Sequence, residues 1–142
     1  MRLNVLLASA LLVLGVLIVL TPWYILPVCE VYGAYLKTAT GSEIPMKCGW
    51  TARAEIGTGV GIVSIGAVLL AFGKRKETLR ALGVVGATLG VLTVLFPTYL
   101  IGVCASAEHP CNMGTRPGLV LLGVLTIVVS LTMVLTAKEA QV

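Results

Sequence analysis

The chain has 142 residues, of which 58% are apolar and only 11% are charged, and its mean hydropathy is +1.03. A soluble domain usually carries about a quarter charged residues, so this composition excludes an ordinary soluble protein. The formal net charge is +4. We attribute this charge to membrane topology, and we expect no nucleic-acid partner.

Four apolar stretches are each long enough to cross a hydrocarbon layer of about 30 Å, which takes about 20 helical residues. None of them shows the alternation of polar and apolar residues that is typical of barrel strands. The predicted fold is an all-α integral membrane bundle of four transmembrane helices, which form a single membrane domain over residues 1–142. In chain order, the expected helices are Val5–Pro27, Thr51–Phe72, Leu79–Val103 and Pro117–Ala137.

The first stretch has one alternative interpretation, a secretory signal peptide, because Arg2 precedes its run of leucines and valines. The apolar region is longer than the usual core of about 7–15 residues, and no small-residue cleavage site precedes Thr21. We therefore expect the first stretch to be retained as a helix.

Short loops rich in Lys and Arg stay on the cytoplasmic side of a membrane. Residues 73–80 contain four cations, and Arg2 and Lys138 lie on the same side of the predicted helices. We therefore expect a multi-pass protein of the plasma membrane with both termini in the cytoplasm and loops 28–50 and 104–116 outside. Four aromatic residues fall near the outer interface, as this orientation requires: Trp23, Tyr24, Trp50 and Tyr99.

An internal repeat relates the two halves of the chain. Residues 14–29 and 89–104 are identical at ten of sixteen positions at a constant offset of 75, and the matches include a Pro-x-Tyr motif and a cysteine. Chance similarity between apolar helices is the alternative, but it does not account for the matched proline, tyrosine and cysteine. We therefore predict a tandem repeat of two-helix hairpins, residues 5–72 and 79–137, related by an axis along the membrane normal.

All four cysteines lie in the two predicted outer loops, where disulfides persist. Four cysteines allow three pairings, and the repeat favours one bridge within each hairpin. The expected structural disulfides are Cys29–Cys48 and Cys104–Cys111.

Two other functions for the cysteines stay open. A metal site would use the thiolates with His109, the only histidine, but the chain has no CxxC motif and an oxidising compartment disfavours free thiols. We therefore predict no metal and no cofactor. Four-helix membrane oxidases of the disulfide-forming type also carry two external cysteine pairs, so a quinone-linked thiol-disulfide oxidoreductase is the alternative function. Their usual CxxC motif, which lowers a thiol pKa, is absent here.

Arg53 and Arg116 each follow a cysteine by five residues and open a predicted helix. Helix N-termini favour anions, so Arg53, Arg116 and the nearby Glu55 are candidates for binding a lipid phosphate or a small anion. The arginines could instead extend to headgroups, and Glu55 could pair with either of them. No titratable residue is expected deep within residues 56–72 or 81–96, which disfavours a stand-alone pump.

Small residues in the second and third helices predict close helix packing, either within the bundle or against a partner membrane subunit. Two pairs have GxxxG spacing, namely Gly57/Gly61 and Gly86/Gly90, whereas Gly59 and Gly66 are seven residues apart. No nucleotide loop, catalytic triad, paired-carboxylate site or haem motif is present, so we predict no catalytic residue.

The segment MKCGWTARAE at residues 46–55, with Pro-Val-Cys upstream at 27–29, resembles a small prokaryotic membrane-protein family described as domain of unknown function 4418. The resemblance covers nearly the whole chain and implies a single four-helix unit without an assigned activity. The family pattern has a histidine after the second cysteine, where this chain has Gly49. That difference makes a metal or proton role at this position less expected.

The resemblance also implies a partnership with export systems of the ATP-binding-cassette type. The expected function is therefore a non-enzymatic accessory or scaffold subunit of a membrane complex, such as one of these transporters, or a homo-oligomer. The expected partners are the lipid bilayer and another membrane protein or a second copy of the chain.

Overall fold

The computed structural model describes residues 2–73 and 75–139. Lys74, one of the cations used above to predict topology, lies outside the described residues, and so do the side chains of Arg2 and Lys138. The described residues form ten helices, helical turns (η) and strands, which in chain order are α1 (Arg2–Leu20), η1 (Thr21–Ile25), η2 (Cys29–Tyr32), β1 (Tyr35–Lys37), β2 (Glu43–Pro45), α2 (Lys47–Phe72), α3 (Lys76–Leu95), η3 (Phe96–Leu100), η4 (Cys111–Thr115) and α4 (Arg116–Glu139).

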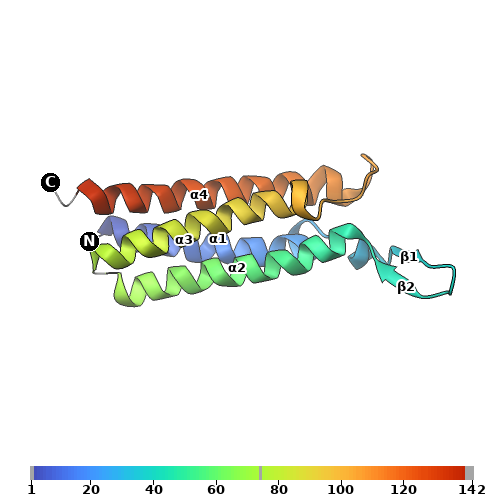
Figure 1. The fold of residues 1–142 in the computed structure, drawn as a ribbon, viewed down its shortest axis with the longest axis horizontal. Coiled ribbons are helices and arrows are strands. Elements are labelled where there is room, and N and C mark those ends of the chain that lie inside the picture. Colours follow the sequence, from blue (N-terminus) through green and yellow to red (C-terminus); the bar gives the residue numbers. More distant parts are fainter. Residues whose placement is uncertain (1, 74, 140–142) are drawn as a thin grey trace.

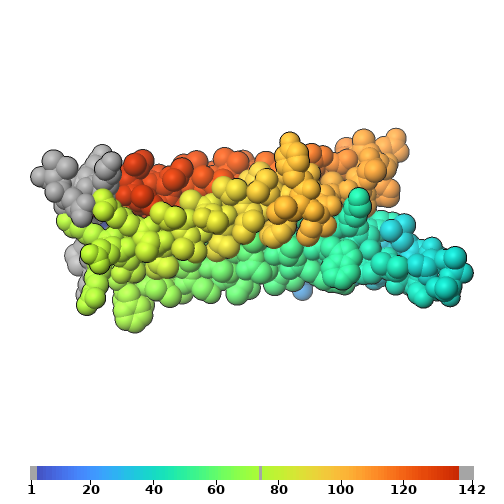
Figure 2. All heavy atoms as spheres, in the orientation of Figure 1, coloured from blue at the N-terminus to red at the C-terminus, as the bar shows by residue number. Residues whose placement is uncertain are grey.

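Among the described residues, four helices are long and apolar enough to cross a membrane, as the sequence predicts. They lie alongside one another as a bundle (Figure 1), with the start of α1, the end of α2, the start of α3 and the end of α4 at one end of the bundle. The β hairpin and residues 101–110 project from the opposite end, here called the loop end (Figure 2).

The helix boundaries differ from the predicted ones at the loop end. The second helix begins at Lys47 instead of Thr51, because the chain leaves β2 through an extended Met46 and turns directly into helix. The fourth begins at Cys111 with the π-helical turn η4, and Pro117 lies in the first turn of α4, where a helix tolerates proline. Both predicted boundaries were too late because the preceding polar residues are helical.

Pro22 and Pro97 each lie in a π-helical turn, η1 and η3. Proline has no N–H to donate, and a wider turn accommodates the lost hydrogen bond. The Leu26 N–H donates to the Thr21 carbonyl at 2.8 Å, and the Ile101 N–H donates to the Phe96 carbonyl at 3.2 Å. The first residues of the two turns, Thr21 and Phe96, are 75 positions apart (96 − 21 = 75).

Residues 35–45 form a short antiparallel hairpin that the sequence analysis did not predict. Its register pairs Tyr35 with Pro45 and Lys37 with Glu43. The turn uses Gly41 at φ +80°, a conformation that glycine adopts without steric cost. The side chains of this hairpin are mostly exposed, so the hairpin extends the loop end without adding a core of its own.

The most extensive helix contacts lie within each two-helix hairpin, between α1 and α2 in the first and between α3 and α4 in the second. Glycines allow the backbones to meet. A Cβ on Gly66 would lie 2.8 Å from the Leu12 nitrogen and 3.0 Å from the Ala8 oxygen, both on α1. On the other hairpin, a Cβ on Gly90 would lie 3.0 Å from the Gly123 oxygen of α4.

The GxxxG prediction is therefore right for both glycines of one pair but for only one glycine of the other, Gly61, which packs against Leu89 of α3. Gly86 and Gly90 both face α4, but Gly57 faces open space, because a methyl group at this position would have nothing within 4 Å. The α1–α2 contact instead uses Gly59 and Gly66, because their spacing of seven residues, two helical turns, keeps them on one face.

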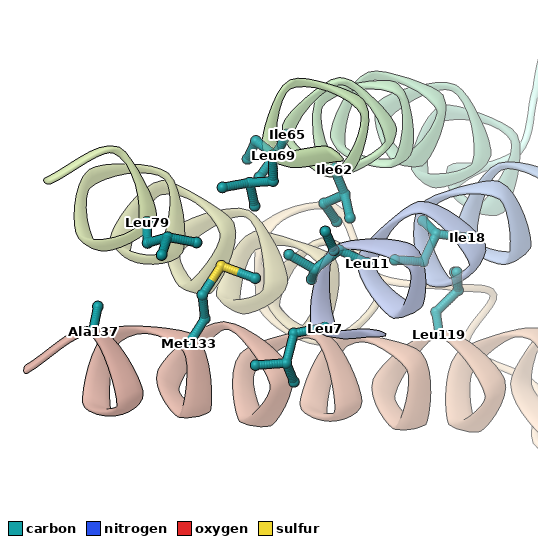
Figure 3. Close-up of a cluster of buried hydrophobic side chains, with 11 residues drawn as sticks. Leu7, Leu11, Ile18, Ile62, Ile65, Leu69, Leu79, Leu119, Met133 and Ala137 are labelled. Atoms are coloured by element: carbon teal, nitrogen blue, oxygen red, sulfur yellow. The ribbon is translucent and has the colours of Figure 1, made fainter. Parts of the chain in front are cut away.

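A hydrophobic core runs between the four helices (Figure 3) and contains side chains from each of them. Leu11 and Ile18 of α1 are fully buried, as are Ile62 of α2 and Leu119 and Met133 of α4. Leu79 of α3 completes the cluster and is 4% exposed. Because lipid is as apolar as these side chains, close packing rather than the hydrophobic effect holds the helices together.

The glycine contacts predict a measurable difference between two equally small substitutions. Gly66→Ala places a methyl against the α1 backbone and should lower the unfolding free energy by about 1–3 kcal/mol. Gly57→Ala meets open space and should leave stability unchanged or slightly raised. Thermal unfolding midpoints in mild detergent check this prediction, and equal midpoints for the two variants would contradict the assigned interface.

Candidate metal centre

The four cysteines meet at the loop end of the bundle, although they come from four separate segments. Cys29 begins η2, Cys48 lies in the first turn of α2, Cys104 lies in the connection after η3, and Cys111 begins η4. Their Sγ atoms all lie within 4.8 Å of one another. We call this group the cysteine cluster.

Contacts within the cysteine cluster join the two hairpins. The Sγ atoms of Cys29 and Cys111 are 3.4 Å apart, and those of Cys104 and Cys48 are 3.5 Å apart. Cys29 and Cys104 approach to 3.9 Å. All four cysteines are free thiols in the structure, so the predicted bridges Cys29–Cys48 and Cys104–Cys111 are not confirmed.

Two hydrogen bonds cross between the hairpins beside the cluster and hold its segments together. The Thr51 hydroxyl of α2 donates to the Gly102 carbonyl at 2.7 Å, and the Thr115 hydroxyl of η4 donates to the Leu26 carbonyl at 2.7 Å. Thr51 and Thr115 are both 1% exposed. Each bond satisfies a carbonyl in the segment that carries a cysteine of the other hairpin.

Apolar side chains pack around the cluster. Cys29, Cys48 and Cys111 are buried, and Val28 and Ala52 pack against them. Trp23 and Val103 cover the cluster further. Cys104 is only half-buried, yet burial and the neighbouring thiols raise its pKa above the ordinary value, because both disfavour the thiolate.

A hollow of about 250 Å³ opens beside the cluster, and Cys104 is the cysteine that lines it. Met46, Lys47 and His109 lie on the walls of the hollow. The Met46 Sδ is 3.8 Å from the Cys104 Sγ, and the His109 Nδ1 is 3.6 Å from the Cys29 Sγ. A sulfur and a nitrogen therefore flank the cluster on its accessible side.

Three of the six sulfur–sulfur distances are close to those of a tetrahedral metal site, and all six lie within 4.8 Å. An ion with metal–sulfur bonds of about 2.3 Å holds its four sulfurs about 3.8 Å apart. The contacts of 3.4, 3.5 and 3.9 Å surround that value. Four sulfur donors favour a thiophilic cation such as zinc or monovalent copper.

The two arginines of the predicted anion site contact different residues. Arg53 donates to Glu30 at 2.8 Å and lies 5.2 Å from the centroid of the Trp50 ring. Arg116 donates to Asn112 at 3.4 Å and borders a shallow hollow with Thr98. The two arginines thus have different partners.

Glu55 pairs with neither arginine, contrary to one predicted option. Its side chain is fully buried, and one carboxyl oxygen, Oε2, accepts a hydrogen bond from Thr58 at 2.8 Å. The other oxygen, Oε1, is buried without a hydrogen-bond partner. Glu55 immediately precedes the segment 56–72, which contains no titratable residue, and its acid lies inside the bundle rather than at an exposed anion site.

Sequence reasoning also missed Met46 as a member of the site. The available signal was its spacing, because Met46 precedes Cys48 by two residues. His109 was considered only as a metal ligand alongside the thiolates. The structure brings both residues to the hollow beside the complete cluster.

The fold and the cluster define a four-helix membrane protein with a thiol-rich site at one end of its bundle. A family model described as Domain of unknown function (DUF4418) matches residues 11–136. The chain therefore belongs to this family, as its sequence motifs indicated. No curated protein and no solved structure matches the chain.

The unequal burial of the cysteines predicts an order of chemical modification. In the reduced protein, a bulky maleimide should label Cys104 about tenfold faster than the three buried thiols, because access limits the reaction of buried cysteines. Mass spectrometry of partially labelled, digested protein measures the order. Uniform labelling of all four would contradict the enclosed cluster.

Proposed function

We propose that this protein is a non-enzymatic membrane protein that binds one thiophilic metal ion through Cys29, Cys48, Cys104 and Cys111. The observation that carries the proposal is the convergence of four sulfurs from four segments within 4.8 Å. Two structural disulfides would need only two separate pairs, each held by its own hairpin. A single group of four sulfurs instead resembles the ligand set of a mononuclear site.

The setting of the cluster also supports metal binding. Three of the four cysteines are buried among apolar side chains, which exclude water from a bound ion. The half-buried Cys104 borders an open hollow, so an ion has a route to the cluster. Buried ligands with one accessible side can hold an ion that is exchanged with another protein or an ion that stays bound.

We propose that the cluster faces the outside of the plasma membrane. The four cations of residues 73–80 in the sequence support this orientation, because the end of α2 and the start of α3 lie at the end of the bundle opposite the loop end (Figure 1). The cysteine cluster lies at the loop end, where η2, α2 and η4 begin. We further propose that the two hairpins are tandem copies. The sixteen-residue repeat supports this origin, as do the π-helical turns, which begin 75 residues apart at Thr21 and Phe96.

Metal binding predicts a defined stoichiometry. Reduced protein in mild detergent should bind one Co²⁺ per chain and show the visible absorption of tetrahedral cobalt with thiolate ligands. Each single Cys→Ser variant should lose affinity by at least about tenfold, since a hydroxyl replaces a thiolate ligand. Metal analysis and absorption titration provide the measurement.

The matched control is Ser106→Ala, which alters the wall of the hollow without removing a sulfur. It should bind Co²⁺ as the unaltered protein does. A chain that binds no metal with all four thiols confirmed as reduced would sink the proposal.

We propose further that the protein works as an accessory subunit of a larger membrane complex, such as a transporter of the ATP-binding-cassette type, or as a homo-oligomer. Among the described residues of the four spans, Glu55 is the one fully buried acid, and it accepts a hydrogen bond from Thr58. Such a bundle offers few groups for moving an ion across the membrane. An ion held at the loop end would therefore pass to, or come from, another protein.

Purification from native membranes in mild detergent should yield the chain together with a second membrane protein or as an oligomer. Size-exclusion chromatography with light scattering, followed by mass spectrometry of the peak, measures the composition. A strictly monomeric chain without a co-purifying protein is the result that contradicts the subunit proposal. It would leave the metal proposal untouched.

A quinone-linked thiol-disulfide oxidoreductase is the second candidate, and the 3.4 and 3.5 Å sulfur contacts favour it. Oxidation at these contacts would join Cys29 to Cys111 and Cys48 to Cys104. The two functions differ in the state of the thiols, because metal binding needs all four reduced. Lipid or small-anion binding is the third candidate and now depends on Arg116, which borders an open hollow.

A further inference from the structure

We infer that the metal is monovalent copper, and that Met46, Cys104 and His109 form the route by which it enters and leaves the cysteine cluster. This inference rests on the proposed metal-binding function and names the ion and its path. Its basis is a continuous series of soft donor atoms that runs from the hollow into the buried cluster.

The donor atoms follow one another at contact distance. The Met46 Sδ is 3.8 Å from the Cys104 Sγ, which is 3.5 Å from the Cys48 Sγ and 3.9 Å from the Cys29 Sγ. The His109 Nδ1 lies 3.6 Å from the Cys29 Sγ, and His109 also lines the hollow. An ion can therefore exchange one ligand at a time without leaving contact with a donor.

The thioether of Met46 distinguishes copper from zinc. Thioether sulfur is a neutral, soft ligand that selects monovalent copper, whereas zinc sites in proteins use Cys, His and carboxylate donors. A methionine beside the accessible cysteine would therefore assist copper and leave zinc unaffected. Met46 is only half-buried, so its sulfur is open to an incoming ion.

Each transfer step is a ligand exchange that conserves electrons. A copper–sulfur bond to Cys48 or Cys29 forms as the bond to Met46 breaks, and the thiol that becomes a ligand releases its proton to water. Copper stays monovalent throughout, and no disulfide forms. The step therefore needs no oxidant or reductant.

The test compares transfer rates of two metals in three proteins: the unaltered chain, Met46→Leu and the control Met113→Leu. Met113 is 72% exposed and lies outside the hollow. Reduced protein is loaded anaerobically with Cu⁺ from a bicinchoninate complex, and the release of Cu⁺ to bathocuproine disulfonate is followed by absorbance. A parallel series measures Zn²⁺ affinity and release with a chromophoric chelator.

Met46→Leu should slow both the loading and the release of Cu⁺ by about tenfold or more, with Zn²⁺ affinity and release unchanged. Met113→Leu should behave as the unaltered chain. Unchanged Zn²⁺ affinity also shows that Met46→Leu leaves the cluster folded. If the Met46→Leu variant does not fold, His109→Gln is compared in the same way and should slow Cu⁺ loading.

Two results overturn the inference while metal binding stands: Cu⁺ rates that do not respond to removal of the Met46 and His109 donors, or equal slowing of Cu⁺ and Zn²⁺. An unaltered, fully reduced chain that binds neither ion overturns the proposed function instead. The two failures are therefore distinguishable.

Discussion

Backbone contact between helices at glycine is the constraint on which the site depends. Gly66 meets the backbone of α1, and Gly90 meets the backbone of α4, so the two helices of each hairpin remain in contact along the bundle. A hairpin whose helices diverged would separate Cys29 from Cys48. The crossing bonds from Thr51 and Thr115 then join the hairpins at the loop end. Close packing within the bundle and hydrogen bonding at its loop end thus together position the four cysteine sulfurs.

The proposed metal site lies where the helices meet the loop end. Apolar side chains pack against the cluster, and a hollow opens beside it. An ion held there would be shielded from water by protein and reached through the half-buried Cys104.

The sequence predicted the four helices because long apolar runs have few alternatives in a membrane. It also placed the cysteines at one end, since their loops follow alternate helices. It could not predict that the cysteines meet across hairpins. The repeat relates Cys29 to Cys104 but contains no information on the distance between them. The contacts that set this distance, such as Thr51 with Gly102, join residues 51 positions apart and leave no local pattern. The hairpin at residues 35–45 was missed because its strands are only three residues long and mostly exposed.

The π-helical turn η4 has a consequence for how the two halves correspond. Cys48 and Cys111 are 63 residues apart (111 − 48 = 63), but the hydrogen-bonding threonines Thr51 and Thr115 are 64 apart (115 − 51 = 64). The wider π-helical turn accommodates the additional residue, so Thr115 takes the position of Thr51, and successive positions on a helix differ by about 100°. Arg116, matched to Arg53 by its distance from the cysteine, is therefore turned onto another face. Exchanging segments between the halves would preserve packing only when the alignment shifts by one residue within this turn.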